Sequence, residues 1–111
     1  MNPFLSVVIL AYNERANLQA GKLAKVAEYL GAQPYSYEVL VVDDGSEDET
    51  AALVEAFACE HRGFCVIRGP HRGKAHAVAT GLLAARGEVV LFSDMDQADR
   101  KSTRLNSSHL A

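Results

Sequence analysis

The stretch LSVVILA, residues 5–11, is a nearly unbroken apolar run rich in β-branched side chains. This pattern is typical of a strand that is covered on both faces, as in a parallel sheet. From Glu14 to Leu30 the apolar residues instead return every three or four positions, which predicts a helix that ends at Gly31. The expected buried stripe of this helix is Leu23, Val26, Ala27 and Leu30.

Strand and helix signals then continue to alternate along the chain. Three further strands are predicted, at YEVLVVD (37–43), FCVIR (64–68) and EVVLFSD (88–94). Between them, Ser46 and Glu49 have the spacing of a capping box, so a helix is expected from about Glu47 to near Gly63. Its expected buried residues are Leu53, Val54 and Phe57.

A third helix is predicted between Gly73 and Gly87, with Ala75, Val78, Ala79 and Leu82 on its buried face. Strands that alternate with helices favour parallel pairing and right-handed crossovers. The fold class that we predict is therefore α/β, a mostly parallel sheet with flanking helices. Ligands of such a sheet bind at the carboxyl ends of its strands.

Composition narrows the class of protein. The chain has 111 residues, of which 49% are hydrophobic and 23% charged, so we expect one small globular domain or part of a larger one, and not a disordered chain. A formal net charge of -3 argues against a nucleic-acid partner. The start of the chain has no basic leader region, and its apolar run is too short to span a bilayer.

The last part of the chain differs from the rest. From Asp99 onward the sequence DRKSTRLNSSH is polar, basic and without periodicity, and it looks like the translation of a common DNA-sequencing adapter. We predict that residues 99–111 are not native and that function resides in residues 1–98. A genuine flexible tail is the alternative.

Polar clusters follow all four predicted strands. Each one alone is typical of an ordinary turn or helix start. Four of them on one edge of one sheet instead indicate a binding site. They are AYNE (11–14), DDGS (43–46), GPHRGKA (69–75) and DMDQA (94–98).

The acidic residues among them predict the ligand. Asp94 and Asp96 are two positions apart, so in an extended strand both carboxylates point the same way, and they would repel each other unless a cation lies between them. Mg²⁺ or Mn²⁺ commonly binds one or two carboxylates together with substrate phosphates. Asp43 or Asp44 would suit the N–H donors of a nucleobase, and another carboxylate could accept ribose hydroxyls. Lys74, at a helix start, would attract an anion. The ligand that we predict is a nucleoside diphosphate with a divalent metal.

Four segments resemble, in order and spacing, the front half of a family 2 glycosyltransferase with the GT-A fold. This likeness covers residues 4–98. Within the family, the chain is most similar to the dolichyl- or polyprenyl-phosphate glucosyl- and mannosyltransferases, because it contains the segment RGKAHAV…G…ARGE. The four segments are SVVILAYNERANL (6–18), VLVVDDGSEDET (39–50), HRGKAHAVATGLLAARGE (71–88) and LFSDMDQA (91–98).

This resemblance implies roles for the same residues. DMD would be the DXD motif, in which Asp96 binds the metal and Asp94 the ribose or the metal shell. Asp43 or Asp44 would contact the base. Residues 1–98 would form the N-terminal nucleotide-sugar-binding part of a truncated GT-A domain. The expected lining of the nucleotide pocket is Ala11, Tyr12 and Glu14.

The resemblance also implies an activity. It is the inverting transfer of a sugar from a UDP-glucose or GDP-mannose type of donor to a polyprenyl or dolichyl phosphate, with Mg²⁺ or Mn²⁺ as cofactor. We expect a cytoplasmic location, at the membrane surface where such an acceptor lies. No catalytic base or acceptor segment precedes Ala98, so this chain alone is expected to bind donor poorly and to be inactive.

Other classes fit less well. A dinucleotide-dependent oxidoreductase needs G-x-G-x-x-G after the first strand, where this chain has AYNERANL. A nucleotide-sugar-binding chain without catalysis and a family 2 transferase with a saccharide acceptor remain as alternatives. His71, where the family usually has asparagine, and Ala75, where these members often have glycine, depart from the family pattern and bear on donor specificity.

Overall fold

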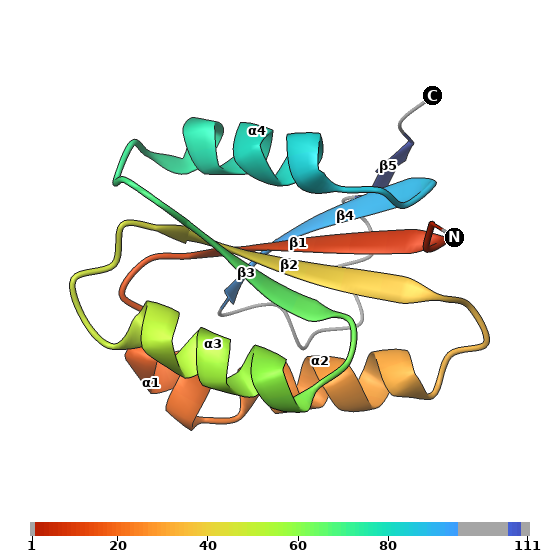
Figure 1. Cartoon of the computed structure of the whole chain (residues 1–111), viewed down its shortest axis with the longest axis horizontal. Coiled ribbons are helices and arrows are strands. Elements are labelled where there is room, and N and C mark those ends of the chain that lie inside the picture. Colours follow the sequence, from red (N-terminus) through yellow and green to blue (C-terminus); the bar gives the residue numbers. More distant parts are fainter. Residues whose placement is uncertain (1, 96–106, 110–111) are drawn as a thin grey trace.

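The computed structural model describes residues 2–95 and 107–109. Within them, strands and helices alternate along the chain up to residue 94 (Figure 1). The elements are β1 Leu5–Ala11, α1 Arg15–Gln19, α2 Lys22–Gly31, β2 Tyr37–Asp44, α3 Thr50–Glu60, β3 Phe64–Gly69, α4 Lys74–Ala84, β4 Val89–Asp94 and β5 Ser107–His109.

The strands form one sheet in the order β3-β2-β1-β4-β5. β1 pairs in parallel with β2 and with β4, and β2 pairs in parallel with β3. β5, which lies in the segment predicted to be non-native, pairs antiparallel with β4. The predicted α/β class with a mostly parallel sheet is confirmed.

Strand register brings the polar loops to one edge of the sheet. At the carboxyl ends, Ala11 pairs with Asp43, Asp94 with Leu10, and Asp44 with the last residue of β3. These ends, and the loops that lead into α1, α3 and α4, lie together at the left of Figure 1. The edge predicted to bind a ligand is therefore assembled from segments far apart in the sequence.

Helices cover both faces of the sheet, as the uniform apolar character of β1 predicts. α4 lies on one face, and α1, α2 and α3 lie on the other (Figure 1). Alternate residues of β1 therefore enter two separate cores. Ile9 packs with residues of α2 and α3, while Val8 packs with Ala77 of α4 and with Val42.

The predicted helix from Glu14 to Leu30 is two helices. α1 ends at Gln19 and α2 begins at Lys22, with Gly21 between them at φ 84°. This left-handed conformation breaks the helix and is open to glycine without steric cost. The predicted stripe still lies on α2, where Leu23, Val26 and Leu30 are buried.

The predicted capping box is wrong. α3 begins at Thr50, three residues later than expected, and the Ser46 hydroxyl donates to the Asp43 carboxylate at 2.5 Å. Asp48 instead accepts the backbone N–H of Thr50 at 2.9 Å and also contacts its hydroxyl. The Ser46 side chain thus bonds to Asp43 and to the backbone N–H of Asn13, 33 residues away, instead of forming a helix cap. Of the expected buried residues of α3, Val54 is fully buried and Phe57 packs against the core.

The buried face of α4 agrees with the predicted one only in part: Val78 and Leu82 pack against the core as expected. Ala77 and Gly81 are buried, whereas Ala75 and Ala79, which were expected inside, are exposed. The reason is close packing, because a Cβ at Gly81 would lie 2.4 Å from Cγ1 of Val8 and 3.3 Å from Cγ2 of Val42. Glycine lets the helix backbone approach the sheet, and this close approach determines which face points inward.

Gly81→Ala should destabilise the fold by about 1–2 kcal/mol. Overpacking of a core commonly costs ~1–3 kcal/mol, and the higher helix propensity of alanine offsets part of that cost. Gly31→Ala is the matched control, since no atom lies within 4 Å of a Cβ there. Urea denaturation should show a lower midpoint for Gly81→Ala and an equal or higher one for Gly31→Ala. Equal effects of the two changes would contradict close packing at Gly81.

Candidate functional site

A pocket of about 220 Å³ opens at the carboxyl edge of the sheet. The residues that line it come from the ends of β1, β2 and β4, from the loops after β1 and before α4, and from α4 itself. Six of them were singled out from the sequence: Ala11, Tyr12, Glu14, Asp44, Lys74 and Asp94. The others are Leu10, His71, Gly73 and Ala77.

Among the predicted site residues that the structure describes, Asp43 is not part of this lining. Asp43 is buried next to the pocket, but its carboxylate turns to Ser46, where it accepts the backbone N–H at 3.1 Å and the hydroxyl at 2.5 Å. Asp96 lies outside the described residues. Of the two candidate base contacts, the structure therefore brings only Asp44 to the pocket wall.

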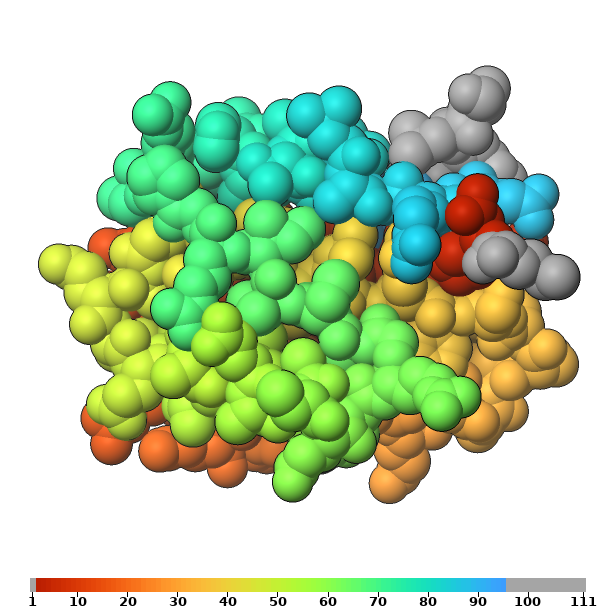
Figure 2. Space-filling view, viewed as in Figure 1, coloured from red at the N-terminus to blue at the C-terminus, as the bar shows by residue number. Residues whose placement is uncertain are grey.

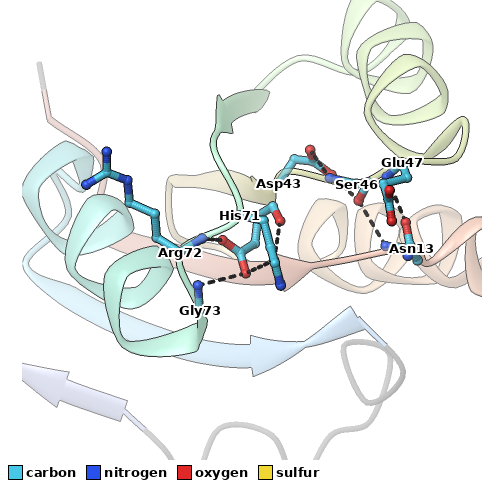
Figure 3. Close-up of polar contacts among 8 residues, drawn as sticks. Asn13, Asp43, Ser46, Glu47, His71, Arg72 and Gly73 are labelled. Carbon is cyan, nitrogen blue, oxygen red and sulfur yellow. Dashed lines mark hydrogen bonds and ion pairs between the residues drawn. The ribbon is translucent and has the colours of Figure 1, made fainter.

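Asp43 belongs to a group of hydrogen bonds that joins the loop after β1 to the loop after β2 (Figure 3). The backbone N–H of Asn13 donates to Ser46 Oγ at 2.9 Å, and Asn13 Oδ1 accepts the backbone N–H of Glu47 at 2.9 Å. Asn13 itself has φ 52°, a left-handed value that asparagine tolerates better than most residues. These hydrogen bonds hold the two loops together, so that the neighbouring residues Tyr12 and Asp44 both line the pocket.

Glu14 is hydrogen-bonded to the first residue of α3 and to a residue of α1. Its backbone N–H donates to Thr50 Oγ1 at 2.8 Å, and its Oε1 accepts from Asn17 Nδ2 at 2.8 Å. The loop after β1 is thus bonded to the start of α3 as well as to the loop before it.

The Asp44 carboxylate binds the loop before α4. Oδ1 accepts the backbone N–H of Arg72 at 2.9 Å, and Oδ2 accepts that of Gly73 at 3.2 Å; Figure 3 labels these two donor residues. Burial raises the pKa of the Asp44 carboxyl, but these N–H groups and the charge of His71 together hold the pKa below its ordinary value. Its stabilising contribution is present above the unfolded pKa of about 3.9 and is lost as the pH falls through the lower folded pKa.

His71 lies between Asp44 and Tyr12. Its Nδ1 is 3.0 Å from Asp44 Oδ2 and 3.0 Å from the Asp44 carbonyl oxygen, and its ring stacks on Tyr12 with centroids 4.3 Å apart. The backbone of His71 is seated against Gly45, where a Cβ would lie 2.5 Å from His71 N. The close approach of these two loops is also visible at the left of the space-filling view, where the segments after β2 and before α4 meet (Figure 2).

Lys74 and Asp94 face each other across the pocket. Lys74 Nζ, at the first residue of α4, is 3.6 Å from Asp94 Oδ1 at the end of β4. Both side chains are substantially exposed, so the pair adds little stability and can exchange partners. A cation and a carboxylate that are both available at one pocket suit a ligand that carries phosphates and a metal.

The described residues supply only some of the oxygen ligands that a hard cation would need. Asp94 offers carboxylate oxygens, the ligand type that Mg²⁺ and Mn²⁺ prefer. No cluster of three or more His, Cys, Asp or Glu side chains suited to a metal occurs in the described part of the chain. The second predicted ligand, Asp96, falls outside that part. Diphosphate oxygens of a bound ligand would supply the remaining donors.

Sequence reasoning gave His71 no binding role, although it marked the residue as a departure from the family pattern. Nothing in the local sequence tells that the loop before α4 folds back over the loop after β2. The signal that could have pointed to it is Gly45, because a glycine after two aspartates suits close approach of another segment. None of the helices within residues 2–95 has the length and the apolar character of a membrane-spanning segment.

Comparison with known proteins gives consistent matches. Residues 6–105 match the sequence profile described as Glycosyl transferase family 2. The chain is 36% identical over 105 residues to the dolichyl-phosphate beta-glucosyltransferase ALG5D of Trichomonas vaginalis, covering 89% of this chain and 32% of the relative. It is 37% identical over 106 residues to the dolichyl-phosphate beta-glucosyltransferase of Dictyostelium discoideum, covering 87% and 32%. The chain thus spans about a third of the length of the curated relatives it matches.

A solved structure matches the fold as well as the sequence. The mannosyltransferase PcManGT from Pyrobaculum calidifontis, in complex with GDP-Man and Mn²⁺, superposes with a TM-score of 0.72 at 34% identity. The match covers 86% of this chain and 28% of that protein.

Proposed function

Because the chain belongs to glycosyl transferase family 2, we propose that it is the donor-binding part of an inverting hexosyltransferase. The donor is a nucleoside-diphosphate sugar of the UDP-glucose or GDP-mannose type, and the acceptor is a polyprenyl or dolichyl phosphate. The relatives named for dolichyl-phosphate glucosyl transfer support this acceptor. The neighbour that binds GDP-Man and Mn²⁺ supports the donor class and a divalent metal.

One observation carries the proposal. The pocket at the carboxyl edge joins an aromatic ring, a hydrogen-bonded carboxylate, a lysine and a second, exposed carboxylate from four separate segments. A nucleoside diphosphate offers the matching groups: a planar base with N–H donors, ribose hydroxyls and a charged diphosphate. An ordinary turn would not require all four types of side chain at one pocket.

Each residue has a role that its position allows. Asp44 accepts an N–H of the base, and Tyr12 packs against the base plane. Glu14 or Asp94 accepts ribose hydroxyls. Lys74 exchanges its ion pair with Asp94 for the diphosphate, and the backbone N–H groups at the start of α4 favour an anion at the same place. Asp94 and Asp96 would hold a divalent ion, which would supply Lewis-acid assistance to the departing diphosphate.

In the transfer, an acceptor oxygen bonds to the anomeric carbon while the bond from that carbon to the diphosphate oxygen breaks. A phosphate acceptor is already ionised near neutral pH, so positioning matters more than a strong base. The groups that bind and position the acceptor lie beyond this chain, which covers 32% of its relatives. This chain alone is therefore a nucleotide-sugar-binding unit without turnover, and a saccharide acceptor is the alternative for the whole protein.

Two further proposals follow from the same assignment. Residues 1–98 form the native part of the domain, and residues 99–111 are foreign sequence. In the whole protein the site faces the cytoplasm at a membrane surface, where a lipid phosphate is presented. The uninterrupted gene sequence beyond Ala98 tests the first point directly.

Isothermal titration calorimetry with UDP and with GDP tests donor binding. We expect at least one of them to bind weakly, and Mn²⁺ should raise its affinity by about tenfold or more, since each added charge-assisted contact contributes ~1.5–3 kcal/mol. Asp94→Asn should lose most of this gain. Glu55→Gln, an exposed acidic residue of α3 paired with Arg68, is the control. Equal affinity with Mn²⁺ and with a chelator would overturn the metal assignment, and no binding of either nucleotide would overturn the function.

A further inference from the structure

His71 makes two contacts that the proposed function does not use. Its ring stacks on Tyr12 with an interplanar angle of 21°, and its Nδ1 lies 3.0 Å from the Asp44 carboxylate. Tyr12 and Asp44 are the two residues assigned to the nucleobase. His71 therefore already contacts both of them from within the pocket.

The contacts of Nδ1 fix where its hydrogen lies. Nδ1 is 3.0 Å from the Asp44 carboxylate oxygen and 3.0 Å from the Asp44 carbonyl oxygen, and both of these atoms are acceptors. Nδ1 must then carry the hydrogen and donate it. The ring of His71 thus presents a planar face to Tyr12 and an N–H to Asp44.

A nucleobase bound at this site would make the same pair of interactions, a ring face on Tyr12 and an N–H on Asp44. We propose that His71 occupies the place of the nucleobase in the ligand-free chain, and that donor binding requires its ring to leave. His71 is then an affinity-determining residue of the donor site that acts by competition. This inference rests on the proposed function.

Only the side chain of His71 is free to make this exchange. Among the described residues, the other donors to Asp44 are backbone N–H groups of Arg72 and Gly73. The backbone of His71 is held against Gly45, where even a Cβ would come within 2.5 Å. The His71 side chain is 57% exposed, so its ring can turn toward solvent by rotation about the Cα–Cβ bond.

The size of the effect follows from the two contacts. A partly exposed ion pair and an aromatic stack together bias an equilibrium by roughly 3- to 30-fold. When the binding-competent state is a fraction of the population, the apparent dissociation constant rises by the inverse of that fraction. Removal of the His71 ring should therefore increase affinity for the nucleotide by about the same factor.

Titration calorimetry of UDP and GDP with the whole 111-residue chain tests the inference. His71→Ala is expected to bind nucleotide about 3- to 30-fold more tightly than the unmodified chain. Two variants separate the contacts. His71→Asn keeps an N–H near the position of Nδ1 but has no ring, and His71→Phe keeps the ring but has no N–H. Both should show a smaller gain than His71→Ala.

The matched control is His61→Ala. His61 also stacks on an aromatic ring, Phe57, and its Nδ1 also lies 2.9 Å from a backbone carbonyl oxygen, but it is outside the pocket. Its removal should leave nucleotide affinity unchanged. Thermal unfolding of each variant monitors folding separately from binding.

The outcomes separate the inference from the function on which it rests. Weaker or unchanged binding by a folded His71→Ala variant, beside clear binding by the unmodified chain, overturns the competition and leaves donor binding intact. Absence of binding by both overturns the proposed function and the inference with it. An NMR titration adds a direct readout: nucleotide should move the imidazole resonances of His71, and those of His61 should stay in place.

Discussion

Asp44→Asn is expected to weaken nucleotide binding by about 10- to 100-fold. The change removes the negative charge that would accept the base N–H, and hydrogen bonds to charged groups contribute ~1.5–3 kcal/mol. It also places an NH₂ group against the backbone N–H groups of Arg72 or Gly73, which now share the carboxylate. Calorimetry with UDP and GDP in the presence of Mn²⁺ measures the loss.

Asp43→Asn is the informative comparison, because the sequence leaves the two aspartates equivalent. The Asp43 carboxylate is used by Ser46 and does not line the pocket, so this change should lower thermal stability and reduce affinity by less than Asp44→Asn does. A larger loss of affinity in Asp43→Asn would assign the base contact to Asp43 and contradict the geometry.

Glu38→Ala is expected to be the most destabilising single change outside the apolar core, at about 2–4 kcal/mol. Glu38 Oε2 accepts the Ser6 hydroxyl at 2.6 Å and the backbone N–H of Arg86 at 2.7 Å, in a site that is almost fully buried. The change would leave these donors without a partner, at a cost of ~1–3 kcal/mol for each group. Against a typical stability of about 5–15 kcal/mol, this is a large fraction.

Arg86→Ala separates the buried hydrogen bonds from the ion pair. The Arg86 guanidinium is 3.3 Å from Glu38 Oε1, but the Arg86 side chain is mostly exposed, so its removal should cost only about 0–1 kcal/mol. Its backbone N–H still reaches Glu38. Urea denaturation of both variants decides between the two contributions. Equal destabilisation would mean that the ion pair, and not the buried network, stabilises this end of the sheet.

The buried network around Glu38 lies at the end of the sheet opposite to the binding pocket. It lies at the amino ends of β1 and β2 and bonds the segment between α4 and β4 to them, through Arg86 and through the Gly87 N–H that donates to Ser6 Oγ at 2.8 Å. The binding pocket lies at the opposite, carboxyl ends. The polar cluster at the amino ends therefore stabilises the sheet, and the polar cluster at the carboxyl ends is open to a ligand.

Much of the site was predictable because parallel strands align their ends. Once the four strands were recognised from their apolar runs, Tyr12, Asp44, Lys74 and Asp94 had to lie at one edge. The choice between Asp43 and Asp44 was not predictable. Neighbouring residues of a strand point in opposite directions, and only the sheet's surroundings decide which direction faces Ser46 and which faces the pocket.

The local errors have a common cause. Ser46 has the right spacing for a capping box, but Asn13 and Asp43, one of them 33 residues away, claim its hydroxyl. On α4, Ala75 and Ala79 were wrongly expected to be buried because alanine at 75 and 79 is as apolar as alanine at 77. The orientation of α4 is set by the close contact of Gly81 with Val8, and the spacing of apolar residues along the helix does not predict this contact.

Sequence alone determined the order of strands and helices, the parallel sheet and the family, because apolar periodicity and motif spacing are local properties of the chain. Tertiary structure decided which of two adjacent carboxylates faces the pocket and that a histidine from a third loop rests on both Tyr12 and Asp44. These are contacts between segments about 30 to 60 residues apart, and their geometry exists only once the strands are paired.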